Sequence, residues 1–387
     1  MTTAAAELRR ASPERVAQLT GEVVYLYAFD VAYEMNRLPV RELLGQPVAQ
    51  FVIDATKRTP RQLFFYRPQM IRLPPLERLT PQGPIRLERT VKLLPVGAIS
   101  ITVRVPFTAA SLGELVHYHD LRFSDGTVLY DEVRHLAEET RNQLRPYSIR
   151  PAERLGDEEA YTVFCLHGPI KSPDGSLVRA EDWLATHRRD VAALLNEEAD
   201  PARLSDQEVE ESTGKYFSYS VHDLTAIDWD AALIVDDPRS FDEILYLMEL
   251  ANLQLAELEA YDRILDAAVD RSYRDLSTTS RFRARKTTSV QRELREIRID
   301  LARLSDELSN ITKFFGDWHL ARIYKGLSDR FHLADWHRTI DEKLKTLDDL
   351  YQILRSDQNN RTMLVLEVTI VLLFVIDLVI LVLGLKK

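Results

Sequence analysis

The feature that most constrains this chain is an apolar segment near its C-terminal end, from Met363 to Leu385. Two acids, one threonine and one glycine are its only interruptions. As a helix rising ~1.5 Å per residue, the segment would be roughly 34 Å long, enough to cross the ~30 Å hydrocarbon core of a bilayer. We therefore predict one transmembrane helix at 362–385, which holds the rest of the chain at a membrane.

The two acids inside this segment, Glu367 and Asp377, need an explanation. An ionisable group at bilayer depth costs about 2.5–3.5 kcal/mol on insertion scales. Their spacing leaves them about 80° apart around a helix, on one loose face. Glu367 lies near the boundary, but Asp377 lies deep in the span. We predict that the span associates with copies of itself or with a partner, the acids being protonated or hydrogen-bonded between helices. The alternative is that Asp377 is protonated and merely tolerated.

The composition predicts a folded body on the cytoplasmic side of that membrane. Of 387 residues, 45% are apolar and 28% are charged, and the net charge of −10 argues against a surface built throughout for nucleic acid. The single cysteine excludes an intramolecular disulfide and fits a reducing compartment. No apolar h-region of a secretory signal occurs in the first 21 residues. We expect a single-pass, C-terminal anchor inserted after synthesis, most simply in a bacterial inner membrane.

The soluble part divides at Pro238. Residues 1–20 predict a peripheral helix, and residues 21–238 predict an α+β (or α/β) domain, because β-branched and aromatic runs alternate with helical patterns. We expect strands at 22–30, 96–105 and 159–167, two more within 215–235, and helices at 111–118, 131–145 and 182–196. The proline-rich passage 68–84 predicts a loop, and Pro106 is expected to end its strand.

Beyond Pro238 the pattern changes to helical seams. From Ser240 to Arg355 there is no proline, and apolar residues recur at alternating four- and three-residue steps. Such spacing predicts helices that pack along their length as a coiled coil or bundle. We predict a stalk of three antiparallel helices over 239–361, with breaks at 272–289 and 316–333 and the third helix continuing into the span.

The first break is the most basic part of the chain. Its cationic residues are Arg271, Arg274, Arg281, Arg283, Arg285 and Lys286. In an antiparallel stalk this turn lies at the membrane surface, where anionic head groups attract such segments by ~1 kcal/mol per cation. A solvated, Ser/Thr-rich loop whose arginines form internal ion pairs is the alternative, and it is favoured over lipid contact. Contact with RNA or a ribosome is weaker, because few aromatic residues interleave with the arginines.

Candidate catalytic residues are sparse. Asp228 and Asp230, on or after a predicted strand, could jointly hold a divalent cation, but acids at a strand end more often cap or solvate the edge. His117 and His119 have strand-like spacing without a third ligand. Cys165 is more readily a core residue than a nucleophile. Nucleotide-cradling and nucleophile-elbow motifs are absent from the sequence, so no cofactor and no small-molecule substrate is predicted.

The last 170 or so residues resemble a known family. The acids of the span, the runs 223–230 (DLTAIDWD) and 250–258 (LANLQLAEL), and the Asp317-Trp318 stretch before Tyr324 make the likeness. They resemble the membrane-anchored proteins related to the mitochondrial "required for meiotic nuclear division" proteins. The resemblance implies an α/β domain with a helical, membrane-tethered tail. It also implies oligomers that tether or scaffold translation at the inner membrane, with no established enzymatic activity.

These observations predict a self-associating, membrane-tethered scaffold or adaptor whose partners are lipids and further copies of the chain. Two alternatives stay open. One is a metal-dependent hydrolase or transferase with its site near Asp228 and Asp230. The other is an RNA or ribosome tether that uses the basic turn at 271–298.

Overall fold

The computed structural model describes residues 18–35, 40–51, 68–172, 174–277, 298–299 and 318–384. The chain forms two compact units, one built from residues 1–257 with 310–333 and the other from 258–309 with 334–387. We call the first the head and the second unit 2. The helix expected within residues 1–20 falls almost wholly outside the described residues, as does most of the second stalk helix. The head is a mixed α+β fold, and the final helix of the chain is apolar over much of its length, as expected.

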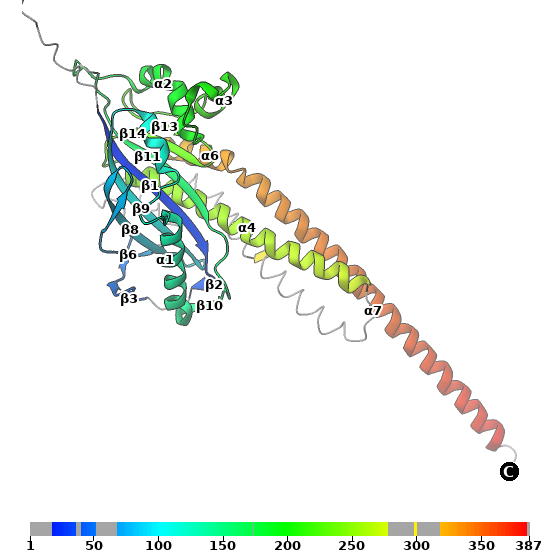
Figure 1. Ribbon diagram of the computed structural model, residues 1–387. Coiled ribbons are helices and arrows are strands. Elements are labelled where there is room, and N and C mark those ends of the chain that lie inside the picture. The colour runs from blue at the N-terminus through cyan, green and yellow to red at the C-terminus, as the bar shows by residue number, and fades with distance from the viewer. Residues whose placement is uncertain are drawn as a thin grey trace, which may run out of the picture. The chain divides into compact units, whose positions relative to one another are not determined.

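A ten-stranded sheet forms the centre of the head (Figure 1). Its order is β12-β13-β14-β11-β1-β9-β8-β6-β5, with β7 paired to β8. The strands are β1 (Leu19–Asp30), β5 (Ala49–Gln50), β6 (Gln69–Arg72), β7 (Leu76–Thr80), β8 (Gly83–Leu93), β9 (Ala98–Ala109), β11 (Glu159–His167), β12 (Tyr216–Phe217), β13 (Leu224–Ile227) and β14 (Ala231–Asp236). Two small ladders pair β2 (Ala32–Met35) with β10 (Ser148–Pro151) and β3 (Glu42–Leu43) with β4 (Gln46–Pro47). The pairing is antiparallel except between β11 and β14.

Helices cover both faces of this sheet. The helices of the head that precede α4 are η1 (Leu112–Tyr118), α1 (Leu129–Leu144), η2 (Arg145–Tyr147), α2 (Ala180–Leu195), η3 (Pro201–Arg203) and α3 (Asp206–Thr213). Side chains at alternate positions of β1 and β9, such as Tyr25 and Ile101, share a core cluster with α1 and α2. The opposite face meets the start of α4 (Phe241–Ser277). Because both faces are covered, residues 23–29 of β1 are all buried, and this part of the strand is continuously apolar.

Buried polar contacts fix α4 on the sheet. Glu249 of α4 forms an ion pair with Lys92 of β8 and accepts a hydrogen bond from Ser100 of β9 at 2.5 Å. Asn252, one turn further along, donates to the carbonyl oxygen of Glu159 at 2.9 Å. A buried ion pair requires close geometry, so these contacts specify where α4 lies on the sheet rather than merely adding stability.

The proline-rich passage 68–84 is not a loop, contrary to the prediction, because it contains β6, β7 and the start of β8. Its prolines fall between strands or where no ladder bond is required. Pro84 pairs only with Leu79 of β7, since β8 meets β9 from Glu88 onwards. Pro106 likewise does not end β9, which continues to Ala109 beside β1. Proline is tolerated wherever one edge of a strand is unpaired.

A helix, α6 (Trp318–Arg330), occupies the expected break at 316–333, so that prediction is wrong. The segment has apolar residues at helical spacing, and Leu320, Ile323, Tyr324 and Leu327 are buried. Tyr324 donates a hydrogen bond to the buried Gln254 at 2.5 Å. The segment therefore packs as part of the head, and a second helix that the sequence did not suggest, α3, lies within the head as well.

Unit 2 contains the end of α4 and most of α7 (Leu333–Gly384). Lys343 of α7 lies 2.7 Å from Asp262 and 2.6 Å from Asp266 of α4. Burial favours the neutral amine, but the two carboxylates outweigh it and raise the pKa of Lys343. Asp262, which interrupts the apolar seam of α4, is thus the partner of a cation on α7.

A close approach between β1 and β11 gives the first prediction. A Cβ added to Gly21 would lie 1.9 Å from the carbonyl oxygen of Cys165, so we expect Gly21→Ala to reduce the free energy of unfolding by at least ~2 kcal/mol. Gly113→Ala is the matched control, because its nearest heavy atom is 3.8 Å away. Urea unfolding of the detergent-solubilised full chain measures both, and equal midpoints would contradict the predicted steric role of Gly21.

Candidate functional site

Asp228 and Asp230 lie in the turn between β13 and β14 rather than on a strand. The backbone N–H of Asp228 donates to the carbonyl oxygen of Ala231 at 2.9 Å, which closes the turn. Asp228 is buried, with 8% of its surface exposed, whereas Asp230 is exposed. The two carboxylates therefore have different surroundings and do not share the face of a strand that the sequence suggested.

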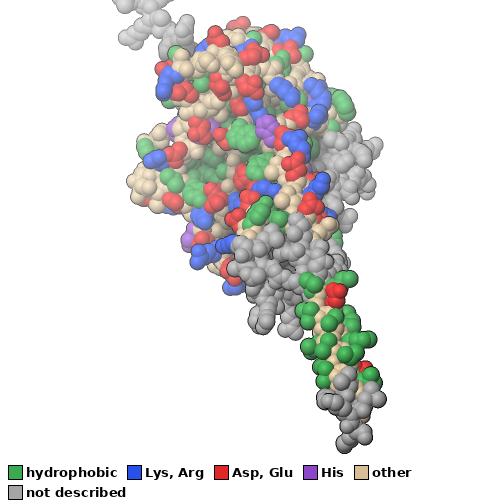
Figure 2. Space-filling model, turned by 90° about the vertical axis from the view of Figure 1, so that its right-hand side faces the viewer, with side chains coloured by type: hydrophobic (Ala, Val, Ile, Leu, Met, Phe, Trp, Pro, Cys, Tyr) green, Lys and Arg blue, Asp and Glu red, His purple; other side chains and the backbone are tan. Residues whose placement is uncertain are grey.

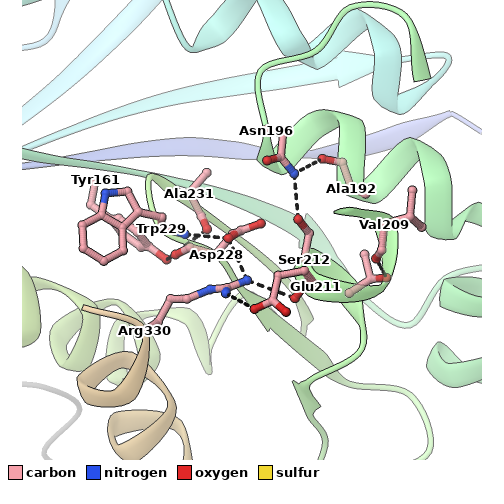
Figure 3. A network of polar contacts seen from close by, with 11 residues as sticks. Tyr161, Ala192, Asn196, Val209, Glu211, Ser212, Asp228, Trp229, Ala231 and Arg330 are labelled. Carbon is pink, nitrogen blue, oxygen red and sulfur yellow. Dashed lines mark hydrogen bonds and ion pairs between the residues drawn. The ribbon is translucent and has the colours of Figure 1, made fainter. Parts of the chain in front are cut away.

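The Asp228 carboxylate is held by a cation and by the turn itself (Figure 3). Its Oδ1 atom lies 2.8 Å from Nη2 of Arg330 and accepts the Trp229 N–H at 2.8 Å. Beneath the turn, the Tyr161 hydroxyl lies 2.9 Å from the Asp228 carbonyl oxygen and 3.0 Å from that of Ala231. Burial raises the pKa of Tyr161 well above its usual value, so this hydroxyl stays a donor.

Arg330 connects this turn to a third element. At the end of α6, its Nη1 atom donates to Oε1 of Glu211 at 2.8 Å, and Nη2 donates to the Glu211 carbonyl oxygen at 3.0 Å. Glu211 lies in α3, so one guanidinium fastens α3 and the β13–β14 turn to α6 (Figure 3). We call Asp228, Glu211 and Arg330 together the Arg330 clamp.

The Arg330 clamp is poorly suited to a metal ion. A guanidinium already neutralises Asp228, and its positive charge would repel a divalent cation at the same oxygen. Throughout the described residues, no group of three or more His, Cys, Asp or Glu side chains is arranged to hold a metal ion. The geometry supports a structural role for Asp228, namely the docking of α6.

His119 and Asp230 share an electrostatic neighbourhood near the end of α2. Nε2 of His119 lies 2.7 Å from the Leu194 carbonyl oxygen, and Nδ1 lies 3.0 Å from Oε1 of Glu197. Burial lowers the pKa of His119 more than these oxygens raise it. Asp230 is exposed as a residue, but partial desolvation of its carboxyl group, followed by the Glu197 carboxylate, raises its pKa. His117 and His119 both line one surface hollow, but the two ring nitrogens of His119 already face the Leu194 carbonyl oxygen and the Glu197 carboxylate.

Cys165 lies wholly inside the core on β11. Burial raises the pKa of its thiol well above the usual value, which disfavours the thiolate that a nucleophile requires. His167, two residues further along, stacks on Phe241 of α4 with ring centroids 6.0 Å apart. His167 is exposed, but the thiol of Cys165 is not, so the two do not form a catalytic dyad that a substrate can reach.

A surface groove beside η1 was missed by sequence reasoning. It consists of two open hollows of about 480 and 380 Å³. The larger lies where β8 diverges from β9 to pair with β7, and its walls include Pro84, Pro106, Phe107 and His117. No motif marks this groove in the sequence, because it arises from strand divergence.

Two of the predicted basic residues are described. Arg271 and Arg274 lie near the end of α4, where each Nε donates to a helix carbonyl four residues earlier, at 3.1 and 3.2 Å. Arg281, Arg283, Arg285 and Lys286 lie outside the described residues. The proposed contact between this segment and anionic lipids or RNA therefore stays a prediction.

The apolar end of α7 is the other candidate site. Met363–Leu381 has a mean hydropathy of 2.9, none of it is buried within the chain, and it is long and apolar enough to cross a membrane. Figure 2 shows hydrophobic side chains around this part of the helix, interrupted by acidic ones. Thr369 donates to the Val365 carbonyl oxygen at 2.7 Å, whereas Glu367 and Asp377 are exposed.

The Arg330 clamp generates a second prediction. Arg330→Met leaves Asp228 buried without its cation, so we expect the free energy of unfolding to fall by about 3 kcal/mol. The control is Lys325→Met, which removes an exposed ion pair from the same helix and should change stability by less than about 0.5 kcal/mol. Thermal unfolding of the full chain in detergent measures both.

The same experiment separates the structural role of Asp228 from metal binding. Adding Asp228→Asn to Arg330→Met removes the uncompensated charge and should recover part of the lost stability. Mn²⁺ or Mg²⁺ should leave the unfolding midpoint of the wild-type chain unchanged. A midpoint that rises with either ion in the wild type, but not in Asp228→Asn, would contradict this assignment.

Comparison with known proteins gives the family. Residues 20–242 match the family model described as "Uncharacterized protein MJ0711, N-terminal domain". The chain is also 23% identical over 260 residues to "Uncharacterized protein MJ0711" of Methanocaldococcus jannaschii, covering 67% of this chain and 76% of that protein. No solved structure matches the chain. Because the matched region spans more than half of its length, the chain belongs to the family defined by this N-terminal domain.

Proposed function

We propose that this family member is a membrane-anchored scaffold: an α+β head for contacts with other molecules, helices that pack as a stalk, and one span that anchors and associates the chains. The observation that carries the proposal is α7. It is one unbroken helix from Leu333 to Gly384 that begins with a buried apolar seam and ends with apolar side chains on all sides. Such an end is stable only where lipid or another apolar surface replaces water.

Internal ion pairs support the stalk. Lys343 joins α7 to α4, and Arg298, within the second predicted stalk segment, lies 2.6 Å from Asp348 of α7. Ile340, Leu344 and Leu347 are buried at the predicted seam positions of α7. These contacts agree with helices packed lengthwise, and the three-helix antiparallel arrangement remains part of the proposal.

The head supports a binding role better than a catalytic one. The acids considered for metal chemistry are held by Arg330 or lie apart from it, and the candidate thiol is in the core. The groove beside η1 offers an open surface for a partner. We place the head in the cytoplasm of a bacterium, at the inner membrane, on the composition and cysteine usage of the chain.

We also propose kinship with the proteins related to the mitochondrial "required for meiotic nuclear division" proteins. The motif residues of the second half support it, including the run at 223–230, which forms β13 and the clamped turn. A tethering role in the neighbourhood of ribosomes is an extension of this kinship, with the basic segment as its contact.

Membrane fractionation tests the anchor. We expect the full chain to remain in the membrane pellet after an alkaline carbonate wash, and a chain ending at Arg361 to move to the supernatant. Asp377→Leu is the matched control, since it changes one residue of the span without lowering its hydrophobicity, and it should stay in the pellet. Extraction of the full chain by carbonate would overturn the proposal of a spanning anchor.

A further inference from the structure

The two acids of the span belong to a single seam. Positions that alternate by four and three residues along the end of α7 are Met363, Glu367, Ile370, Phe374, Asp377, Leu381 and Gly384. This 3.5-residue spacing is that of the a and d positions along which helices pack in a left-handed coil. Both acids and the glycine fall on it, whereas Thr369 does not and bonds to its own helix instead. We call this set the acidic seam.

We propose that the acidic seam is the surface on which a second copy of this chain packs, in parallel, within the membrane. The inference rests on the proposed function, because it requires the segment to span a bilayer. It adds to that function the residues of the contact, the identity of the partner and the relative orientation of the chains.

The chain's own helix packing uses a different face of α7. Ile340, Leu344 and Leu347 are buried in unit 2. At ~100° per residue, Leu344 lies roughly 140° around the helix from Glu367, and Leu347 lies roughly 120° from Asp377. The face that packs within the chain therefore points away from the acidic seam.

No side chain in the described part of the chain forms a hydrogen bond or ion pair with the carboxyl group of Glu367 or Asp377. Glu367 and Asp377 are exposed and make no side-chain contact with the other described residues. Those residues contain one helix able to cross a membrane, so they offer no second span as a neighbour. Polar groups in hydrocarbon are stabilised by hydrogen bonds between helices, and under this proposal the second helix comes from another chain.

A second copy of the chain supplies a carboxyl partner at the level of Glu367 and another at the level of Asp377. Identical chains insert with the same orientation, so Glu367 meets Glu367 and Asp377 meets Asp377, roughly 15 Å apart along the axis. A carboxyl group both donates and accepts hydrogen bonds when it holds its proton, which lets like pair with like. Gly384, also on the seam, permits close approach of the backbones. A different protein would need matching groups at both depths.

Disulfide scanning in membranes tests the seam. Single cysteines are introduced into the full chain at Phe374 and Leu381, on the seam, and at Leu372 and Val379, on the opposite face. Cys165 is buried in the core, and the unaltered chain controls for it. We expect Phe374→Cys and Leu381→Cys to form covalent dimers on oxidation, and Leu372→Cys and Val379→Cys to stay monomeric.

The acids are tested in the Phe374→Cys background. Adding Asp377→Leu should raise the dimer dissociation constant roughly threefold to thirtyfold, the range expected for interhelical hydrogen bonds, and so lower the cross-linked fraction. Asp377→Asn should retain the dimer, because an amide also donates and accepts. Asp377→Leu combined with Val379→Asp returns an acid to the span off the seam and should not restore it.

Each contrary outcome has one meaning. Equal cross-linking on both faces, no dimer from a chain that fractionates with membranes, or a dimer insensitive to Asp377→Leu would overturn the acidic seam while leaving the anchor intact. A covalent product of another mass would show a different partner. Absence of the chain from carbonate-washed membranes would instead overturn the anchor and the seam together.

Discussion

The head depends on one strand whose two edges and two faces are all in use. β1 pairs with β9 along its whole length and with β11 along most of it, and its side chains are buried alternately against two helical layers. A strand that is paired on both edges and covered on both faces has little space for larger side chains where neighbouring backbones approach closely. Gly21 shows the limit, because its backbone meets that of Cys165 with no space for a side chain. The helices on either face are consequences of this burial, since apolar side chains on both sides have to be covered.

Ion pairs that include a buried charge hold α4 and α6 against the rest of the head. Glu249 ties α4 to Lys92 of the sheet, and Arg330 ties α6 to α3 and to the β13–β14 turn. In each case the partners are far apart in sequence, and a wrong placement of the helix would leave a charge buried without its counter-ion. Apolar packing alone tolerates small shifts of a helix, whereas these pairs do not. They make α6, which follows more than sixty residues after the start of α4, a part of the head.

The end of α7 has a surface suited to lipid rather than to water. Its apolar side chains surround the helix, so no single face can be buried by the head or by unit 2. A bilayer satisfies the apolar surface but not the carboxyl groups, and this mismatch is what gives the span its proposed partner. Under our proposal, one face of this helix packs within the chain and a different face packs between chains.

The sequence by itself determined the local features of this protein. Continuous apolar runs identified β1 and β11, the 3.5-residue pattern identified α4 and the first part of α7, and hydropathy identified the one candidate span of the described residues. These signals are short-range, and each depends on residues that are neighbours along one element. Only the tertiary structure decided that the prolines of 68–84 lie between strands and at open edges, and that α6 folds onto the head. It also decided that Asp228 binds Arg330, a partner about a hundred residues away, rather than a metal ion with Asp230. Strand order and ion pairing join distant parts of the chain, and a pattern read along the sequence does not say which distant residues will meet.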